Sequence, residues 1–463
     1  MPSPSFSSLS AVERAAALAD PGSLRLLSAD PALCVVTAQA TLDGRRVLLA
    51  LTDGHQRGGT IGRAEARQLG ELVALAERRR GAVVMCWDTG GVRVQEGPAA
   101  LGEASALGVR LARLALGGTP VATVVSGPRG CFGAPSVIAA VGHGTALTRS
   151  ALWGLTGPRL LEGGEQQHDA AREVMSAAAR RRAGHATVVV DDLPSAVRQT
   201  LIQSLAAPRP RVGAASAIGR GLAITRRLLA QLDPPETGAI GLAARQRDFF
   251  AYSFRGQWRT TAPSVRLGLV HAAWGELAGT RTLGIIVGPE RSSHGIGVAD
   301  AHAVLHAVHE AVRSAPGAPI VTFLFCRGHA SDLRQERAGL SRALAECLRG
   351  LVAARLAGHP LVCVLGGGAY GAAYLSIAAP SHRILAMQGT TIAPMAPRVL
   401  ATFRELRQLH DAASDGDDLA ALIPGIRIVE SVVRLPRALA DELATLRAAD
   451  PEPRRRRLAV PPG

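Results

Sequence analysis

The sequence contains no lysine, so all 52 basic side chains are arginine. This absence excludes a Schiff-base lysine, the phosphate-binding lysine of a P-loop and a lysine that could carry biotin on this chain. Aromatic residues make up only 3% of the chain, so stacking platforms for nucleic-acid bases are not expected. Each apolar run is interrupted by Gly, Pro or Arg before it could span a bilayer. We therefore expect neither a nucleic-acid partner nor a membrane.

Cysteines are few and scattered: the six of them form no C-x-x-C pair that could seed a zinc site or a redox couple. We expect buried, reduced thiols and no metal site. The Ser/Pro-rich start, MPSPSFSSLS, lacks the charged and apolar regions of a signal peptide. These features together predict a cytoplasmic protein.

The chain is long and strongly basic. Its 463 residues leave room for two domains, and a formal net charge of +15 favours an acidic partner, such as a phosphorylated cofactor or an acidic carrier protein. The densest basic run, Arg454 to Arg457, lies in a Pro-rich tail, where we favour a solvated segment over a binding patch.

Hydrophobic periodicity in the first half predicts alternating strands and helices. CVVTAQATL and RRVLLALTD are typical of a hairpin with its turn at Asp43-Gly44. A Gly-rich loop and an amphipathic helix ending at Gly81 follow, and then a buried strand over 82–87. A helix over about 99–116, the strand VATVVSG and a further helix complete the pattern.

The second half repeats this order, with the strand PIVTFLFC, a loop, a helix, the strand LVCVLGG and GAYGAAYLSIAA. Trp87 and Pro120 are 33 positions apart, and Cys326 and Pro360 are 34 apart. We infer a duplicated α/β unit. Breaker-rich segments between the copies place the domain boundary near residue 245, which gives domains 1–245 and 246–463.

In each half, the repeat brings Gly-rich turns to the carboxyl ends of neighbouring parallel strands, where open α/β sheets form their sites. The first-half turns are DTGGV (88–92) and GCFGA (130–134). Residues that begin a helix have amide groups without intrahelical acceptors, and two such amides that converge on one oxygen form an oxyanion hole. A purely structural strand-to-helix turn is the alternative, and the occurrence of such turns in both halves favours catalysis.

Other motifs allow a chemical and a structural interpretation. GGGAYG (366–371) fits the dinucleotide fingerprint G-x-G-x-x-G, but no acidic residue stands about twenty positions on, so we interpret it as the second oxyanion turn. His302, His306 and His309 share a helical face, for which we favour a solvated polar surface over a metal site.

Two further features of the first-half turns carry alternatives. Cys131 is interpreted as a packed thiol, because no residue is placed by sequence to activate it as a nucleophile. Asp88 and Glu96 allow two interpretations. They form a carboxylate pair, or Asp88 caps a helix while Glu96 has a surface or ion-pair role.

At these residues the chain resembles the carboxyltransferase family of the crotonase-like superfamily. DTGGVRVQEG resembles the family's D-S-G-G-A-R-I-Q-E-G, and GAYGAAY resembles its A-Y-G-G-A-Y. GPRGCFGAPSVIAA and WGLTGPRLLE are similar to segments of the beta subunit of biotin-independent malonate decarboxylases, and FRGQW and LAGHPLVCVLGGGAYGAAY are similar to the gamma subunit. The likeness covers most of residues 10–400 and implies a natural beta–gamma fusion with two duplicated crotonase-like β-β-α domains.

The resemblance implies decarboxylation of a malonyl thioester through an enolate that amide groups stabilise. From the paired glycine turns in the duplicated halves, our hypothesis assigns the first-half hole to the thioester and the second-half hole to the carboxylate side. The residues proposed as catalytic are Gly91, Val92, Gly133, Ala134, Gly371 and Ala372. Those proposed as substrate-binding are Gly58, Gly59, Gly90, Arg93, Gly130, Cys131, Phe132, Gly157 and Tyr370. The candidates for the residue that donates a proton to the enolate are Tyr370, Tyr374 and Arg93.

The implied substrate is a thioester on the phosphopantetheine arm of an acidic acyl carrier protein, or on coenzyme A, with no covalently bound cofactor. The implied partners are that carrier and an acyltransferase subunit, and a homo-oligomer is left open. Ala134 stands where the family has glycine, and Val92 stands at the position where the family has alanine or valine. Thr156 stands where the family has asparagine. An amide donor survives the first two changes, although the width of the pocket is altered.

Two other functions remain. A biotin-dependent acyl-CoA carboxyltransferase shares the motifs, although the absence of a four-cysteine zinc ribbon disfavours the bacterial acetyl-CoA carboxylase beta type. A non-catalytic subunit that binds an acyl carrier is favoured by the greater divergence of the second half. Fold alone does not decide among the three.

Overall fold

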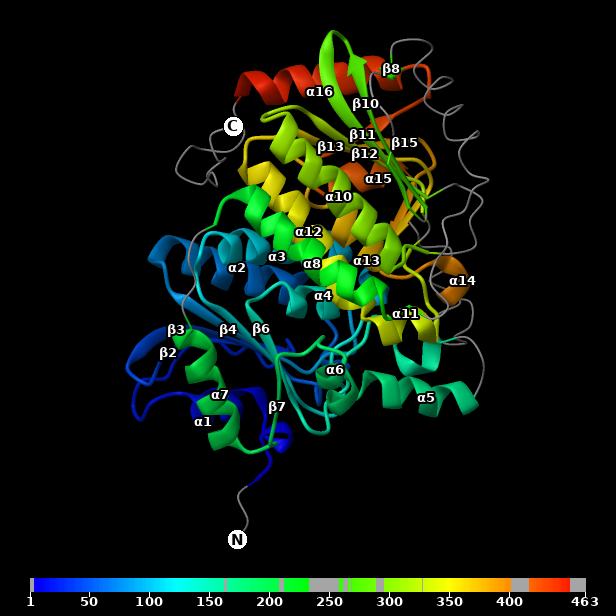
Figure 1. The fold of residues 1–463 in the computed structure, drawn as a ribbon. Helices are drawn as coiled ribbons and strands as arrows, with labels where there is room; N and C mark the ends of the chain where they lie inside the picture. Colours follow the sequence, from blue (N-terminus) through cyan, green and yellow to red (C-terminus); the bar gives the residue numbers. More distant parts are fainter. Residues whose placement is uncertain are drawn as a thin grey trace. The chain divides into compact units, whose positions relative to one another are not determined.

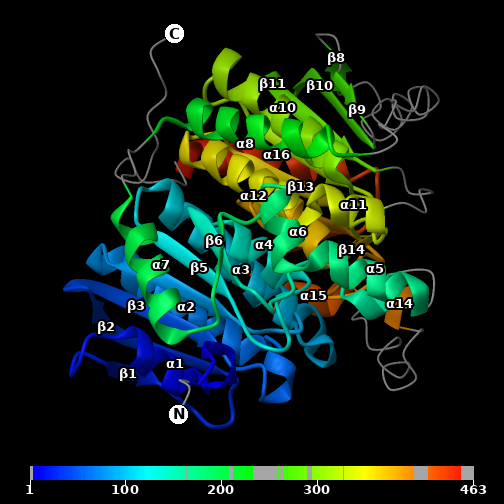
Figure 2. The same ribbon diagram turned by 60° about the horizontal axis from the view of Figure 1, so that its bottom comes forward.

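The structure is a computed structural model of the chain (Figures 1 and 2). It describes residues 4–161, 165–207, 212–232, 258–260, 265–267, 269–288, 295–326, 328–400 and 416–449. The proposed domain boundary near 245 and the arginine run at 454–457 lie outside these ranges. The chain forms two compact units. Unit 1 comprises Met1–Glu96, Glu103–Arg211 and Ser331–Ala345, and unit 2 comprises Gly97–Gly102, Val212–Ala330 and Glu346–Gly463.

Unit 1 is built on a seven-stranded sheet in which spatial order follows chain order. The first two pairings are antiparallel and the remaining four are parallel. The strands are β1 (Arg25–Ser28), β2 (Val35–Leu42), β3 (Arg45–Thr52), β4 (Ala82–Trp87), β5 (Val121–Val125), β6 (Gly144–Thr148) and β7 (Val188–Val190). The predicted turn at Asp43-Gly44 joins β2 and β3, and both turn residues have positive φ, as a tight hairpin requires.

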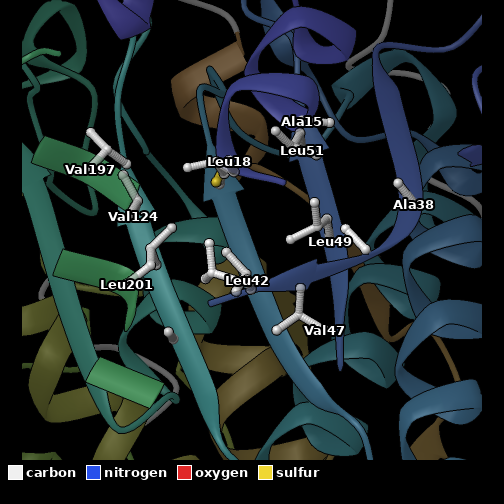
Figure 3. Close-up of a cluster of buried hydrophobic side chains, with 14 of the residues drawn as sticks. Ala15, Leu18, Ala38, Leu42, Val47, Leu49, Leu51, Val124, Val197 and Leu201 are labelled. Atoms are coloured by element: carbon white, nitrogen blue, oxygen red, sulfur yellow. The ribbon is translucent and has the colours of Figure 1, made fainter. Parts of the chain in front are cut away.

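Helices cover both faces of this sheet. They are α1 (Ala11–Leu18), α2 (Arg63–Arg79), α3 (Gly97–Leu116), α4 (Ala134–Ala140), α5 (Glu165–Met175), α6 (Ala177–Arg182), α7 (Pro194–Ala206) and α11 (Leu333–Ala338). Helices α1 and α7 lie side by side on one face (Figures 1 and 2). Their apolar sides pack on alternate residues of β2 to β5, which gives the core cluster of Figure 3. Because successive side chains of a strand point to opposite faces of the sheet, every second side chain of these strands packs against α1 and α7.

Unit 2 repeats the plan with an eight-stranded sheet. Its order is β17-β15-β13-β12-β11-β10-β8, with β9 paired to β10. The neighbouring strands β11, β12, β13, β15 and β17 are parallel to one another. The strands are β8 (Trp258–Thr260), β9 (Val265–Leu267), β10 (Val270–Leu277), β11 (Thr280–Val287), β12 (Ile320–Leu324), β13 (Leu361–Leu365), β15 (Arg383–Met387) and β17 (Ile426–Val429). Two short strands, β14 (Gly368–Tyr370) and β16 (Thr391–Ala393), form a separate parallel pair.

Unit 2 also carries helices on both faces of its sheet. They are α8 (Ala214–Leu229), α10 (Val298–Ser314), α12 (Leu340–Leu356, which begins in unit 1), α13 (Gly371–Ala373), α14 (Pro397–Leu400), α15 (Gly416–Leu422) and α16 (Leu435–Ala449). Helix α16 packs its leucines on the sheet and closes a second apolar core. The α/β duplication expected from the sequence is confirmed. Every helix in the described part of the chain is too short or too polar to traverse a lipid bilayer.

The structure corrects the interpretation of the three histidines on α10. His302, His306 and His309 are half-buried against α8 rather than on a solvated face, and His302 Nδ1 lies 2.8 Å from Thr225 Oγ1 of α8. Burial lowers the pKa of His302 and of His309, so neutral imidazoles are favoured. The sequence analysis missed α8, which is why this face was taken as exposed. Within the described ranges, no group of His, Cys, Asp or Glu side chains is arranged to hold a metal ion.

The core cluster of unit 1 yields a stability prediction. Leu49 of β3 is 1% exposed and packs in this cluster, so Leu49→Ala removes buried methyl groups and leaves a cavity. We expect a loss of about 3 kcal/mol in the free energy of unfolding. Leu26 of β1 is 42% exposed, and Leu26→Ala should change stability by less than about 0.5 kcal/mol. Urea titration measures both, and equal effects would contradict this packing.

Candidate active site: amide groups at the carboxyl edge of each sheet

Loops that follow β3, β4, β5 and β6 are joined by short parallel bridges at the carboxyl edge of the unit 1 sheet. Ile61 pairs with Val92, and Cys131 pairs with both Thr89 and Trp153. A Cβ atom built on Gly133 would lie 3.7 Å from the Cα atom of Gly91. The two turns predicted from the sequence, 88–92 and 130–134, are therefore in contact.

The amide groups of these turns differ in whether they have acceptors. Gly91 donates to Thr89 Oγ1 at 3.1 Å, and Gly133 donates to the carbonyl of Leu155 at 2.9 Å. In contrast, the amide groups of Val92 and Ala134 donate to no described residue. Ala134 is the first residue of α4, where an amide has no intrahelical acceptor. Of the four first-half residues proposed as catalytic, Val92 and Ala134 thus have amide groups available to an oxygen ligand.

Asp88 has a structural position that neither sequence alternative described. Its side chain is fully buried and accepts hydrogen bonds from the amides of Gly54, after β3, at 3.2 Å and Arg129, after β5, at 2.9 Å. Arg14 Nη2 of α1 lies 3.9 Å from Asp88 Oδ2. A Cβ on Gly127 would lie 2.1 Å from the same oxygen, so only glycine fits there. Asp88 is therefore neither a helix cap nor a partner of Glu96: it holds three loops together.

Arg93 and Glu96 belong to a different cluster. The Arg93 guanidinium bonds to the carboxylates of Glu65 and Glu96 and to the carbonyl of Thr60 at 2.8 Å. Hydrogen bonds and charge from these two carboxylates outweigh burial and raise the pKa of Arg93. The hydrogen-bond partners of this side chain lie within the loops, which disfavours Arg93 as a substrate contact or a proton donor.

Other residues proposed to bind substrate support the loops through their backbone. Gly90 donates to the carbonyl of Gly58 at 2.9 Å, and Gly130 accepts from the amide of Thr89 at 2.8 Å. Gly59 packs so closely that a Cβ would lie 2.0 Å from the Asp88 carbonyl oxygen.

The remaining proposed residues lie nearby in the same loops. The amide of Phe132 donates to Thr89 at 3.3 Å, and the carbonyl of Gly157 accepts from Leu160 at 2.8 Å. Cys131 is buried, and burial together with the nearby Asp88 charge holds the pKa of its thiol well above the usual range. A buried neutral thiol agrees with a packing role.

Unit 2 carries a copy of this backbone arrangement. Ile296 donates to Gly328 at 2.9 Å and accepts from Ala330 at 3.0 Å, just as Ile61 donates to Gly91 at 2.9 Å and accepts from Arg93 at 2.8 Å. Gly91 and Gly328 both have positive φ, at 122° and 144°. Gly328 and His329 are therefore the counterparts of Gly91 and Val92.

The sequence analysis did not assign Gly328 and His329 to the site, although their loop had been identified in the repeat. Burial lowers the pKa of His329 to about 4, so its imidazole is neutral near pH 7.

The second glycine turn of unit 2 follows β13. The amide groups of Gly371 and Ala372 donate to no residue that the structure describes, as at Ala134. The segment 366–371 contains the short strand β14 and leads into α13, which continues directly as a π-helical segment over Tyr374–Ala378. At this carboxyl edge a groove of about 460 Å³ is lined by Phe325, Gly366, Gly367, Met387, Gly389 and Leu435.

Two tyrosines of this turn were candidate proton donors. The Tyr370 hydroxyl lies 2.7 Å from Thr391 Oγ1. Burial raises the pKa of Tyr374, whose side chain is enclosed. Both side chains are therefore part of the packing around the turn.

Two sheets of mainly parallel strands, each with helices on both faces and glycine turns at its carboxyl edge, define an α/β protein, and the predicted α/β class is confirmed. Residues 5–190 match the family profile of the carboxyl transferase domain, and residues 291–459 match that of the malonate decarboxylase gamma subunit. The chain belongs to the carboxyltransferase family, as a fusion of parts like the beta and gamma subunits of malonate decarboxylase.

Individual relatives agree with this assignment at the level of sequence. The crystal structure of a Pseudomonas malonate decarboxylase MdcD–MdcE hetero-dimer is 33% identical, covers 45% of this chain and 90% of that chain, and has a TM-score of 0.39. A Pseudomonas malonate decarboxylase hetero-tetramer in complex with malonate is 31% identical, covers 51% and 94%, and has a TM-score of 0.43.

Carboxyl transferase subunits of acetyl-coenzyme A carboxylase are also similar. The acetyl-coenzyme A carboxylase carboxyl transferase subunit beta of Treponema denticola is 31% identical over 129 residues, which are 28% of this chain and 49% of that protein. The chain thus spans about half the length of the curated relatives it matches.

The Asp88 environment predicts a pH-dependent cost of losing Arg14. Burial raises the pKa of Asp88, and Arg14 opposes this rise. The pKa of Asp88 is thus higher in the folded protein than in the unfolded chain, so the cost of its buried charge is fully present above the folded pKa and vanishes as pH falls below the unfolded pKa. We expect Arg14→Met to lower the free energy of unfolding by about 3 kcal/mol at pH 7 and by less at pH 5.

Urea titration at the two pH values measures this difference. The double variant Arg14→Met/Asp88→Asn, which removes both charges, serves as the control and should recover much of the loss at pH 7. A loss that is the same at both pH values, or no recovery in the double variant, would contradict the assigned interaction.

Proposed function

We propose that this protein decarboxylates a malonyl thioester to the acetyl thioester. The observation that carries the proposal is the pair of acceptor-free amides, Val92 and Ala134, on two touching turns of unit 1. Family membership supports it, because the Pseudomonas malonate decarboxylases are 33% and 31% identical to this chain.

The reaction needs little more than these amides. The bond between the carboxylate carbon and the α-carbon breaks, carbon dioxide leaves, and the electron pair moves onto the thioester oxygen as an enolate. A proton then adds to the α-carbon and gives the acetyl thioester. An amide aimed at the developing oxyanion stabilises the transition state by about 3 kcal/mol. Val92 and Ala134 would supply two such donors for the thioester oxygen.

We further propose that the thioester is carried on the phosphopantetheine arm of an acidic acyl carrier protein, with free coenzyme A as the simpler alternative, and that no cofactor is bound covalently. The net charge of +15 supports an acidic partner. Assembly with other subunits, among them an acyltransferase, is proposed by analogy, since the Pseudomonas relatives crystallised as a hetero-dimer and a hetero-tetramer.

A biotin-dependent carboxyltransferase is the second candidate. The 31% identity to an acetyl-coenzyme A carboxylase subunit favours it, and both reactions pass through an enolate held by similar donors. The two functions differ in where the carboxyl group goes. Release of carbon dioxide from malonyl-coenzyme A without biotin supports decarboxylation, whereas transfer to added biotin with no release would replace our proposal.

Proline substitution tests the donor at Ala134 directly. Ala134→Pro deletes the amide hydrogen at the first position of α4, where proline fits the helix. We expect kcat for carbon dioxide release from malonyl-coenzyme A to fall by about 10² to 10³-fold with little change in KM. Gly371 cannot be tested in this way, because its φ of +49° excludes proline.

Ala177→Pro provides a matched control. Ala177 is the first residue of α6 in the same unit, and Ser176 before it has φ −63° and ψ 151°, which suits a following proline. This variant should keep wild-type kcat. A folded Ala134→Pro protein with wild-type turnover would remove Ala134 from the proposed oxyanion hole.

A further inference from the structure

Glu336 of α11 is a fully buried carboxylate in unit 1, although its segment, Ser331–Ala345, begins 120 residues after Arg211, where the rest of that unit ends. One oxygen, Oε1, accepts from the amides of Leu155 at 2.8 Å and Thr156 at 2.6 Å. The other oxygen, Oε2, accepts from Arg180 Nη2 at 2.9 Å. The carboxylate thus receives three donors, and all three come from the segment matched by the carboxyl transferase profile.

Leu155 links this carboxylate to the oxyanion turn. Its amide donates to Glu336, and its carbonyl accepts from Gly133 at 2.9 Å. Gly133 directly precedes Ala134, whose amide has no described acceptor. A movement of Leu155 would therefore displace Gly133 and change the direction of the Ala134 amide.

The same segment holds the turn at a second point. Ser136 Oγ donates to the carbonyl of Gly133 at 2.7 Å and lies 2.8 Å from Ser341 Oγ, and Arg342 donates to the carbonyl of Ala140 at the end of α4 at 3.2 Å. Residues 331–345 therefore contact both ends of α4. Arg180 adds a bond from Nε to the carbonyl of Trp153 at 2.7 Å, which fixes the strand-like segment beside the turn.

We propose that Glu336 is a positioning residue for the first-half oxyanion turn, so that the gamma-like part of the chain supplies the carboxylate on which the beta-like site depends. This inference rests on the proposed function. A buried ion pair contributes little to stability compared with apolar residues of the same size, so stability alone does not explain a buried carboxylate here. Its contacts explain it better, because they restrain the residues that orient Gly133 and Ala134.

Three variants separate positioning from stability. Glu336→Ala removes the acceptor for Leu155 and Thr156, and we expect kcat to fall by about 10 to 100-fold, less than for loss of a donor, with KM within about threefold. Glu336→Gln keeps one oxygen acceptor for the amides of Leu155 and Thr156 and leaves Arg180 with its bond to Trp153, so kcat should return to within about fivefold of wild type. Urea titration establishes that each variant is folded at the assay temperature.

Asp20→Ala is the matched control. Asp20 also accepts from two amides, those of Asp43 at 2.9 Å and Gly44 at 2.8 Å, and pairs with an arginine, Arg198, but it lies at the β2–β3 hairpin. This variant should lose stability without a change in kcat. A folded Glu336→Ala protein with wild-type kcat, or a Glu336→Gln protein as impaired as Glu336→Ala, would overturn the inference.

Failure of the proposed function gives a different result. In that case the wild-type protein releases no carbon dioxide from malonyl-coenzyme A. The role of Glu336 is then tested by amide hydrogen exchange of residues 131–137 in the wild-type protein and in Glu336→Ala. Unchanged protection there, beside unchanged protection in Asp20→Ala, would overturn the positioning role independently of any activity.

Discussion

The candidate site of unit 1 depends on one buried carboxylate, that of Asp88. It joins the end of β4 to the loops after β3 and β5 through the amides of Gly54 and Arg129, and Arg14 of α1 lies beside it. Without this carboxylate, those loop amides would be buried without acceptors, which costs free energy for each one. The turns that carry Val92 and Ala134 are built on these same loops. The proposed catalytic geometry therefore depends on Asp88, which holds the loops that carry the substrate-facing amides and does not itself contact substrate in this proposal.

This arrangement also explains the number of glycines in the turns. Asp88 is approached so closely by Gly54 and Gly127 that a Cβ on either would lie 2.3 Å or less from its carboxylate oxygens. Glycine at these positions serves the anchoring of Asp88, and glycine elsewhere in the turns allows loop backbones to touch. The sequence analysis interpreted the glycine turns through their amide groups, and the structure shows that several of these glycines also permit close contact between loops.

Sequence reasoning identified what local pattern and repetition determine. The hairpin at Asp43-Gly44, the strand 82–87 and the duplicated order of strands and turns all follow from residues close together in the chain. Apart from the Arg93–Glu96 pair, the contacts that define the roles of Asp88, Arg93 and Glu336 join residues 28 to 181 positions apart, which no spacing rule indicates. The histidines of α10 were misplaced for the same reason, because the helix that covers them was not predicted. A buried charged residue can be predicted from sequence, but its partner is known only once the fold shows which distant residues lie beside it.

The two units show why such a site can tolerate a large change in sequence. Thr89-Gly90-Gly91-Val92 and Cys326 to His329 share little in side chains, yet Gly91 and Gly328 have similar φ angles and their neighbours make the same pair of bonds to Ile61 and Ile296. Even the side-chain contact is repeated, since Thr89 Oγ1 and Cys326 Sγ each approach the carbonyl of the glycine two residues on, at 3.5 and 3.0 Å. Amide groups are common to all residues except proline, so selection for amide donors constrains backbone angles more strongly than side chains. Backbone geometry is accordingly the feature by which other divergent members of this family should be compared.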